Sequence, residues 1–321
     1  MRFMKITLLD RDSLGMDTPV ERLSQIGEVE IFEKSSPEQV SDRIKNSEVV
    51  IINKVKITRE IIKKAKKLKL ICVFATGYDN IDVEAAKEYG VGVCNVPGYS
   101  TDSVALYTVT TALSLYTHIF EYNDFIKRDD YEKSGCANLL TPVYHEISGK
   151  VWGIVGCGNI GRAVAKIAQA LGAKVIVNKR TPIDEYKTVD IETLCRESDI
   201  ISLHCPLNDS TRNLIDKEKI SLMKESVVIV NEARGAVTNE SDIADAINSG
   251  RIAAFGCDVY SEEPFSKNHP FQKIKNLPNV LLTPHAAWGA YEARERCLEI
   301  ICNNIKSFYS GELKNRVDLQ K

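Results

Sequence analysis

The chain has 321 residues, of which 44% are hydrophobic and 27% are charged, proportions typical of a soluble globular protein. This length exceeds what one hydrophobic core usually supports, so we expect two domains. The formal net charge of −2 gives no reason to expect a nucleic-acid or membrane surface. No apolar run approaches the roughly 20 residues that a membrane helix needs.

Nine cysteines raise the question of disulfides or a metal site. Their number is odd, their spacing is scattered, and no C-x-x-C pair exists, which favours reduced thiols over disulfides or zinc. Most lie in or beside apolar strand-like runs, where we expect buried thiols: Cys72, Cys94, Cys157, Cys205 and Cys257. The first ten residues read as a strand rather than a signal peptide. We therefore expect a cytoplasmic protein without a metal.

The first part of the chain alternates short apolar runs with helical patterns, which predicts a parallel, doubly wound sheet. The expected strands are 6–9, 29–32, 49–52, 70–74 and 91–94. A segment rich in Ala, Leu, Val and Thr, 102–117, predicts a connecting helix that leads out of this unit. The stretch 129–149 reads as irregular.

A second series of apolar runs then begins, and its six strands match the dinucleotide-binding fold. They are expected at 151–155, 174–177, 199–203, 227–230, 253–256 and 280–282. An amphipathic helix from 290 to about 309 follows the last strand and is free to return to the first unit.

We therefore predict an α/β protein with two doubly wound parallel-sheet domains and a cleft between them. The expected substrate domain is flavodoxin-like and discontinuous, 1–101 plus 290–321, and the expected Rossmann cofactor domain is 102–289.

A glycine motif opens the second series. The strand 151–155 runs directly into Gly156, Gly158 and Gly161, and a helix-forming stretch follows. In a dinucleotide-binding motif the first glycine permits the tight turn, the second lets the backbone approach a pyrophosphate, and the third allows close helix packing. The N-terminus of the following helix offers free amides and a partial positive charge to the anion. The strand and the helix supply the context that this motif needs.

Three polar side chains follow successive strands of the second series. Arg234 follows strand 227–230, Glu263 follows strand 253–256, and His285 follows strand 280–282. Ligands of such folds bind outside the carboxyl ends of the strands, so we expect these side chains to meet at one edge of the sheet. Together they indicate a catalytic site.

At these residues the chain resembles the D-isomer-specific 2-hydroxyacid dehydrogenases, over almost its whole length. Apart from the glycine motif, the resemblance is carried by the segments 76–82, 95–105, 204–212, 232–235, 258–264 and 284–285. It implies that Arg234, Glu263 and His285 are catalytic, that Asp258 contacts the nicotinamide amide, and that the protein forms homodimers through its cofactor domains. The implied cofactor-binding residues are Thr108, Gly156, Gly158, Asn159, Ile160, Gly161, Lys179, Arg180, Thr181, His204, Cys205, Pro206, Thr211, Glu232, Ala233, Arg234, Asp258, His285 and Ala287.

The chemistry of a 2-oxo acid reductase suits the catalytic residues on independent grounds. The guanidinium of Arg234 can pair bidentately with a substrate carboxylate and donate to the carbonyl oxygen. Histidine changes charge near neutrality, so His285 can supply the proton in reduction and accept it in oxidation. A carboxylate at Glu263 would favour the imidazolium, raise its pKa and fix which ring nitrogen faces the substrate.

The segment after strand 174–177 departs from the commonest NAD-binding pattern, in which an aspartate accepts hydrogen bonds from the adenine ribose. Here Lys179, Arg180 and Thr181 are suited to clamp a ribose phosphate, and no acid appears before Asp184. We therefore favour NADP over NAD. A second departure is Glu232, where a small residue or threonine is expected, and the sequence assigns it no firm role.

Substrate choice depends on weaker motifs. The segments 285–288 and 53–55 resemble the glycerate dehydrogenase and hydroxypyruvate reductase branch, which suggests a small 2-oxo acid of the hydroxypyruvate or glyoxylate type. The expected substrate-binding residues are Lys54, Thr76, Gly77, Tyr78, Arg234, His285 and Trp288.

Other functions remain open. The substrate could instead be a D-lactate-like or bulkier acid or 3-phosphoglycerate, or the chain could be a non-enzymatic nucleotide-sensing protein. A formate dehydrogenase would carry glutamine in place of Glu263.

Overall fold

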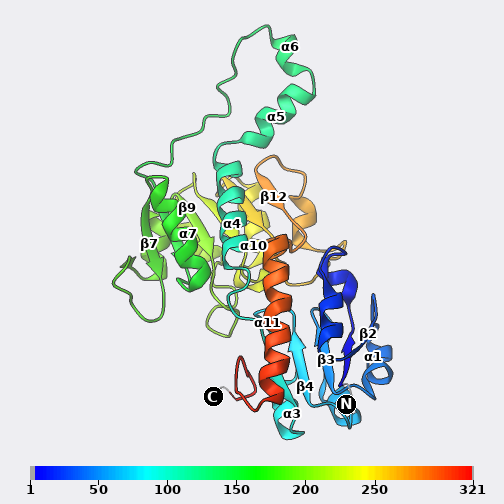
Figure 1. Cartoon of the computed structure of the whole chain (residues 1–321). Helices are drawn as coiled ribbons and strands as arrows, with labels where there is room; N and C mark the ends of the chain where they lie inside the picture. The colour runs from blue at the N-terminus through cyan, green and yellow to red at the C-terminus, as the bar shows by residue number, and fades with distance from the viewer. Residues whose placement is uncertain (1–3, 320–321) are drawn as a thin grey trace. The chain divides into compact units, whose positions relative to one another are not determined.

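The computed structural model describes residues 4–319 and divides into two compact units (Figure 1). Unit 1 comprises the chain up to Ser100 together with the segment from Gly289 onward, and unit 2 is Thr101–Trp288. The boundaries expected from the sequence, after 101 and after 289, each lie one residue away from these. Each unit is built on a fully parallel sheet, as the alternation of apolar runs and helical patterns predicts.

Unit 1 contains a five-stranded sheet in the order β2-β1-β3-β4-β5, the flavodoxin-like arrangement. Its strands are β1 (Lys5–Leu8), β2 (Glu28–Ile31), β3 (Val49–Ile52), β4 (Leu70–Val73) and β5 (Gly92–Cys94). Strands β3 and β4 are buried along their whole length, which is why they read as continuous apolar runs in the sequence.

Helices cover both faces of this sheet. The helices are α1 (Pro37–Ile44), α2 (Arg59–Lys64), α3 (Val83–Glu88) and α11 (Tyr291–Tyr309), with 3-10 turns at Arg11–Leu14 and Val20–Gln25. Apolar residues of α1, α2 and α3 share one core with the sheet. Helix α11 packs on β4, and Asn304 on α11 donates to the backbone oxygen of Asn95 at 3.0 Å. The terminal helix thus belongs to the same compact unit as the first hundred residues.

Unit 2 contains a seven-stranded sheet in the order β12-β11-β10-β9-β6-β7-β8. Its strands are β6 (Val151–Val155), β7 (Lys174–Asn178), β8 (Lys187–Thr188), β9 (Ile200–Leu203), β10 (Val228–Asn231), β11 (Ala254–Cys257) and β12 (Val280–Leu282). The six expected strands are present, with ends shifted by at most one residue. The expected count was wrong by one, because the two-residue edge strand β8 carries no apolar run.

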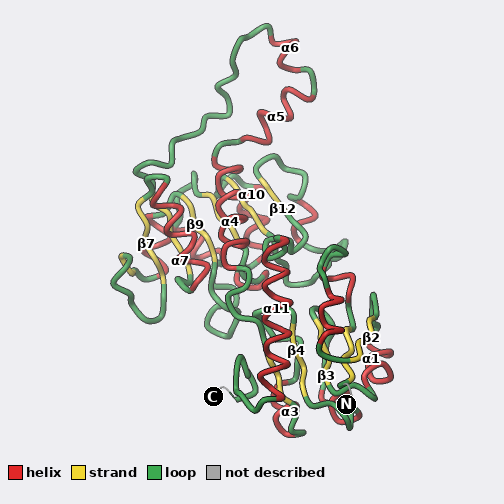
Figure 2. Tube along the Cα trace, viewed as in Figure 1, coloured by secondary structure: helices red, strands yellow, loops and turns green. Residues whose placement is uncertain are grey.

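Two layers of helices sandwich the sheet of unit 2 (Figure 2). The helices of this unit are α4 (Thr101–Tyr116), α5 (Ile119–Lys127), α6 (Asp130–Ser134), α7 (Asn159–Ala170), α8 (Ile191–Glu197), α9 (Lys217–Leu222) and α10 (Glu240–Asn248), with 3-10 turns at Gly235–Val237 and Pro270–Lys273. Helices α4 and α7 share a core with Val228 and Val230 of β10, whereas α8, α9 and α10 share one with Ile229. Alternate residues of β10 therefore face opposite layers.

Helices α5 and α6 extend away from α4 as an arm, and the chain returns from it in an extended segment (Figure 1). Neither helix buries a residue. The interpretation of 129–149 as wholly irregular was wrong at its start, where α6 forms. No helix among residues 4–319 is both long enough and apolar enough to span a membrane. All nine cysteines are unpaired, and the five expected to be buried are buried.

Candidate active site

The glycine motif lies where β6 meets α7. Gly156 has a φ of +91°, a backbone conformation that favours glycine, and a Cβ on it would lie 2.5 Å from the backbone nitrogen of Cys205. By contrast, a Cβ on Gly158 would meet nothing within 4 Å. Gly158 and Asn159 are exposed at the first turn of α7. The tight turn is thus glycine-dependent, and the loop leaves open space at a helix N-terminus, where an anion is favoured.

Two cationic side chains, Arg162 and Lys179, lie near this loop. The charges of Arg162 and Lys179 both act to lower the pKa of Cys157, although burial dominates and raises it overall. Arg162 pairs with Glu185 at 2.9 Å, so the second of the two acids that follow β7, Asp184 and Glu185, is engaged by a cation. Lys179 is half-buried, and Arg180 and Thr181 are exposed directly after β7. The end of β7 therefore presents cations and a hydroxyl, with no carboxylate in the positions that directly follow it.

The turn after β10 carries Arg234. The side chain of Asn231 holds this turn: its Oδ1 accepts from the Ala233 nitrogen at 3.1 Å, and its Nδ2 donates to the Arg234 oxygen at 3.0 Å. A Cβ on the next residue, Gly235, would lie 2.1 Å from the carbonyl carbon of Tyr260. Gly235 therefore lets the Arg234 turn pack directly on the loop that follows β11. Sequence reasoning assigned no role to Asn231, although its position at a strand end signals one.

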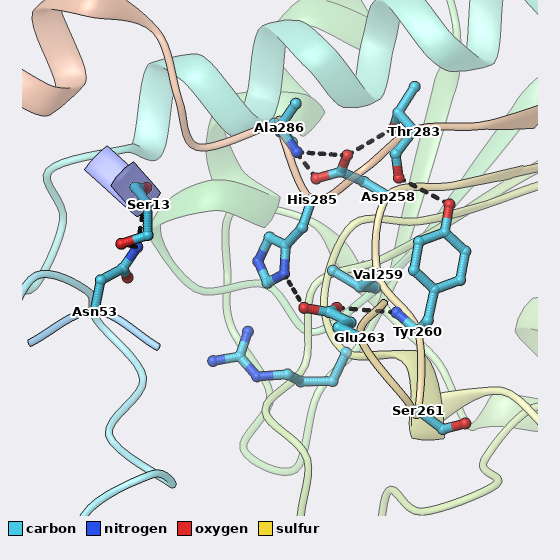
Figure 3. Close-up of polar contacts among 12 residues, drawn as sticks. Ser13, Asn53, Asp258, Val259, Tyr260, Ser261, Glu263, Thr283, His285 and Ala286 are labelled. Atoms are coloured by element: carbon cyan, nitrogen blue, oxygen red, sulfur yellow. Dashed lines mark hydrogen bonds and ion pairs between the residues drawn. The ribbon is translucent and has the colours of Figure 1, made fainter. Parts of the chain in front are cut away.

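Asp258, which follows β11, anchors the loop that follows β12 (Figure 3). It is 1% exposed. Its Oδ1 accepts from the Thr283 hydroxyl at 2.6 Å and from the Ala286 nitrogen at 2.8 Å, and its Oδ2 accepts from the Ala287 nitrogen at 2.8 Å. A buried carboxylate is tolerated when it is hydrogen-bonded in this way, and charge-assisted bonds are worth about 1.5–3 kcal/mol each. Asp258 thus fixes the backbone on either side of the segment that carries His285.

His285 and Glu263 form a direct pair (Figure 3). The Nδ1 of His285 lies 2.7 Å from Oε2 of Glu263, and the other oxygen of Glu263 accepts from the Tyr260 nitrogen at 3.1 Å. The two side chains are 26% and 31% exposed, so the imidazole is reachable by a small molecule. His285 has a φ of +54°, an uncommon conformation for a non-glycine residue. The pair places Nε2 as the ring nitrogen that can face a substrate.

The loop after β9 holds the other expected cofactor residues. Both ring nitrogens of His204 are buried and lack a hydrogen-bond partner among the described residues, and burial lowers the pKa of this ring to about 3. Burial raises the pKa of the Cys205 thiol to about 11, so it is inert. Thr211 donates to the Pro206 oxygen at 2.6 Å and thereby closes the loop.

Two other expected cofactor residues, Thr108 on α4 and Ala287 in the loop after β12, also lie in unit 2. The Thr108 hydroxyl is fully buried and donates to the Val104 oxygen at 2.8 Å within α4. Ser103, also on α4, donates to the Ala287 oxygen at 2.6 Å. Helix α4 thus supports the loop that carries His285, Ala287 and Trp288.

Glu232 is the most unusual side chain of this region. It is 8% exposed, and neither carboxylate oxygen has a hydrogen-bond partner among the described residues. Burial raises its pKa to about 9, the nearby charge of Asp258 adds to the rise, and the Thr111 hydroxyl acts in the opposite direction. Glu232 is therefore a neutral acid at neutral pH.

The expected substrate residues outside this unit lie together within unit 1. Lys54 follows β3, and its nitrogen donates to Oδ2 of Asp10 at 2.6 Å. Thr76, Gly77 and Tyr78 follow the neighbouring strand β4. Asn80 ties the two loops by donating to the oxygens of Asn53 and Val55, at 3.1 and 2.9 Å. The sequence analysis assigned no role to Asp10, although this residue follows the apolar run of β1.

Comparison with known proteins identifies the family. Residues 109–287 match the D-isomer specific 2-hydroxyacid dehydrogenase, NAD binding domain. The hydroxypyruvate reductase of Blautia hydrogenotrophica is 36% identical over 98% of this chain and 100% of its own length. The chain belongs to the D-isomer-specific 2-hydroxyacid dehydrogenase family.

Other similar proteins support the same family assignment. The glycerate dehydrogenase of Methylorubrum extorquens is 35% identical over 98% of this chain and 99% of its own length. Among solved structures, an acyclic imino acid reductase in complex with NADPH and D-Arg has a TM-score of 0.87 and 31% identity, covering 98% of this chain and 100% of that one. The resemblance read from the sequence is confirmed, including its hydroxypyruvate reductase and glycerate dehydrogenase branch.

The structure of this dehydrogenase fits a dinucleotide. The open space above Gly158, the first turn of α7 and the cations near Cys157 suit a pyrophosphate with its ribose substituents. Among residues 4–319, no group of three or more His, Cys, Asp or Glu side chains is placed to hold a metal ion.

Proposed function

We propose that the protein reduces a small 2-oxo acid of the hydroxypyruvate or glyoxylate type to the D-2-hydroxy acid with NAD(P)H. The observation that carries this proposal is the His285–Glu263 pair at 2.7 Å, which follows the strand ends of the NAD-binding unit. The reductase and dehydrogenase names of the similar proteins favour this substrate class.

The proposed mechanism assigns one task to each side chain. The hydride for the carbonyl carbon would come from a nicotinamide cofactor held by the glycine loop between β6 and α7. Arg234 pairs with the substrate carboxylate and stabilises the negative charge that develops on the carbonyl oxygen. His285 delivers the proton to that oxygen from Nε2, while Glu263 holds Nδ1 and compensates the charge of the imidazolium. In the oxidation direction the same nitrogen accepts the proton.

We propose that Lys54, the backbone amides of residues 76–78 and Trp288 bind the substrate. Their support is the resemblance to the hydroxypyruvate reductase branch and the hydrogen bonds of Asp10 and Asn80, which order the two loops of unit 1. A phosphorylated substrate would call for more cations than these residues offer.

We propose NADP as the preferred cofactor. Lys179, Arg180 and Thr181 directly follow β7, and Glu185 is engaged by Arg162. A guanidinium at this place favours a ribose phosphate, whereas a carboxylate would repel it. The solved relative in complex with NADPH is consistent with this assignment.

We also propose that the protein is a cytoplasmic homodimer that associates through its cofactor domains. Nine unpaired thiols suit a reducing compartment. The arm of unit 2, formed by α5, α6 and the extended segment after them, exposes a set of large apolar side chains, which is typical of an interface. They are Ile119, Phe120, Ile126, Tyr131, Leu140, Val143 and Tyr144. A molar mass of one chain by light scattering would exclude the dimer.

The experiment that tests the activity is a panel of hydroxypyruvate, glyoxylate, pyruvate and a bulkier 2-oxo acid, run with NADH and with NADPH. Turnover is followed by loss of the near-ultraviolet absorbance of the reduced cofactor. We expect the highest kcat/KM with hydroxypyruvate or glyoxylate. Tight cofactor binding without turnover on any 2-oxo acid would instead favour a nucleotide-sensing role.

A further inference from the structure

Glu232 lies at a defined place in the sheet of unit 2. Strands β10 and β11 pair with Val230 opposite Gly256 and Asn231 opposite Cys257. Continued by one residue, this register places Glu232 opposite Asp258. The preceding residues of the same parity, Val228 and Val230, pack in the core formed with α4. Glu232 and Asp258 therefore lie side by side, just beyond the strands, on the face that α4 covers.

The two carboxyl groups differ in how they are satisfied. Asp258 accepts three hydrogen bonds, from the Thr283 hydroxyl and from the nitrogens of Ala286 and Ala287. Glu232 accepts no hydrogen bond of ordinary geometry among the described residues, although the Thr111 hydroxyl lies close enough to lower its pKa. Two neighbouring carboxyl groups in a buried site do not both ionise, so the proton resides on the one without donors. Glu232 thus presents an O–H donor and a C=O acceptor that the protein itself does not use.

A buried, unpaired carboxylic acid is costly to keep, so a ligand with the complementary pattern would recover the lost hydrogen bonds. Phosphate and carboxylate groups offer acceptors only, and hydroxyl groups lack the paired geometry. A primary carboxamide offers one acceptor and two donors on one planar group, which matches the acid.

The location of Glu232 also fits this ligand. Hydride and proton must reach the two atoms of one carbonyl bond, so the nicotinamide ring has to lie near His285. Asp258 holds the loop that carries His285, and Glu232 is the neighbour of Asp258.

Resting on the function proposed above, we propose that Glu232 in its protonated form binds the carboxamide of the nicotinamide, donating to its oxygen and accepting from its nitrogen. Glu232 is thereby a specificity-determining residue for the cofactor ring. The glutamate side chain has three rotatable bonds, so its carboxyl group can turn to the ligand without movement of the backbone.

The test compares Glu232→Gln and Glu232→Ala with wild-type protein. Glutamine reproduces the donor and acceptor of a protonated glutamate, whereas alanine removes both. Glu225→Ala, an exposed carboxylate shortly before β10, is the matched control. Dissociation constants are measured by fluorescence titration for NADPH and by calorimetry for ADP-ribose, which lacks the nicotinamide.

We expect Glu232→Ala to weaken NADPH binding about tenfold, as loss of two neutral hydrogen bonds implies, and to leave ADP-ribose binding unchanged. Glu232→Gln and Glu225→Ala should bind both ligands as wild-type protein does. An unchanged ratio of the two constants in Glu232→Ala would overturn the inference. Tighter NADPH binding by Glu232→Gln would also overturn it, because it would mean that an ionised Glu232 opposes the cofactor.

The pH dependence supplies a second readout. The titratable groups that face Glu232 are Asp258, Cys257 and Tyr260 on the β11 side, and α4 presents the Thr111 hydroxyl. Burial raises the pKa of both the Cys257 thiol and the Tyr260 phenol, which leaves them neutral as Glu232 ionises. Because the pKa of Glu232 is about 9, the protonated fraction falls about tenfold between pH 7 and pH 10. The NADPH constant of wild-type protein, relative to ADP-ribose, should weaken by that factor, and the constant of Glu232→Gln should not.

Failure of the proposed function would look different. A wild-type protein that binds neither NADPH nor NADH, or that turns over no 2-oxo acid, would refute the function. A protein that binds the cofactor and reduces 2-oxo acids, yet keeps the wild-type ratio of constants in Glu232→Ala, would refute the role of Glu232 alone.

Discussion

Glu232→Gln should stabilise the fold in a strongly pH-dependent way. The pKa of Glu232 is about 9 in the folded protein, against an ordinary value of 4.5. A raised carboxyl pKa means that the folded state keeps a proton which the unfolded state has already lost. The favourable contribution is therefore fully present below pH 4.5 and is lost as pH rises towards 9. Glutamine does not titrate, so the variant escapes this loss.

The magnitude follows from proton linkage. Between the two pKa values, each pH unit lowers the free energy of unfolding by about 1.4 kcal/mol for one differentially bound proton. At pH 7.5, three units above the ordinary value, the difference between Glu232→Gln and wild-type protein should reach up to about 4 kcal/mol. At pH 5 it should be below about 1 kcal/mol. Few single substitutions stabilise a protein by this much.

Urea unfolding without cofactor, at intervals between pH 5 and pH 8.5, measures this difference directly. Other titrating groups contribute equally to both proteins and cancel. Glu225→Gln, on the exposed carboxylate before β10, is the control and should show a flat difference. A difference for Glu232→Gln that stays constant across this range would show that Glu232 is ionised in the folded state, and the reasoning would be refuted.

Three further outcomes follow from the site. His285→Ala should lower turnover by about 10²–10⁴-fold with little change in the cofactor dissociation constant. Arg234→Ala should lower turnover and also raise the KM of the 2-oxo acid. Near wild-type turnover in either variant would contradict the assigned roles. Glu263→Gln replaces a carboxylate 2.7 Å from the imidazole, so reduction should decline at lower pH than in wild-type protein, and an unmoved pH profile would count against a charge role. Arg180→Ala should weaken NADPH binding by about tenfold and spare NADH, and equal effects on both cofactors would refute the phosphate clamp.

The sequence was sufficient for most of the fold because parallel strands are buried on both faces and read as continuous apolar runs. Strands such as β3 and β10 were located to within one residue for this reason. Strand β8 was not predicted, because Lys187 and Thr188 form a polar edge strand without an apolar run. Helix α6 was not predicted, because it buries no residue and its sequence therefore has no apolar periodicity.

For the candidate site, the sequence predicted which side chains follow the strand ends, and it did not predict the hydrogen bonds that connect them. Residues at strand ends can be named from the topology, which is how His285 and Glu263 were found. The anchoring role of Asp258, and the burial of Glu232 beside it, depend on the register of β10 against β11 and on the cover supplied by α4. These are long-range relations that no local pattern encodes. Glu232 nevertheless stood out in the sequence, because a small residue or threonine is expected at its position, and the structure shows that its carboxyl group is buried.

Asp258 links the conformation of His285 to the protonation of Glu232. The left-handed conformation of His285 costs about 1 kcal/mol or more, and the three hydrogen bonds that Asp258 accepts on either side of this residue outweigh that cost. Burial raises the pKa of the neighbouring Glu232 carboxyl to about 9, and the nearby charge of Asp258 adds to the rise. One more acceptor position remains on Oδ2 of Asp258, which takes one donor from within the chain. An acceptor on Asp258 and a donor on Glu232 are what the two ends of a carboxamide need, so under the role proposed for Glu232 the contacts that hold His285 would also help to recognise the cofactor ring.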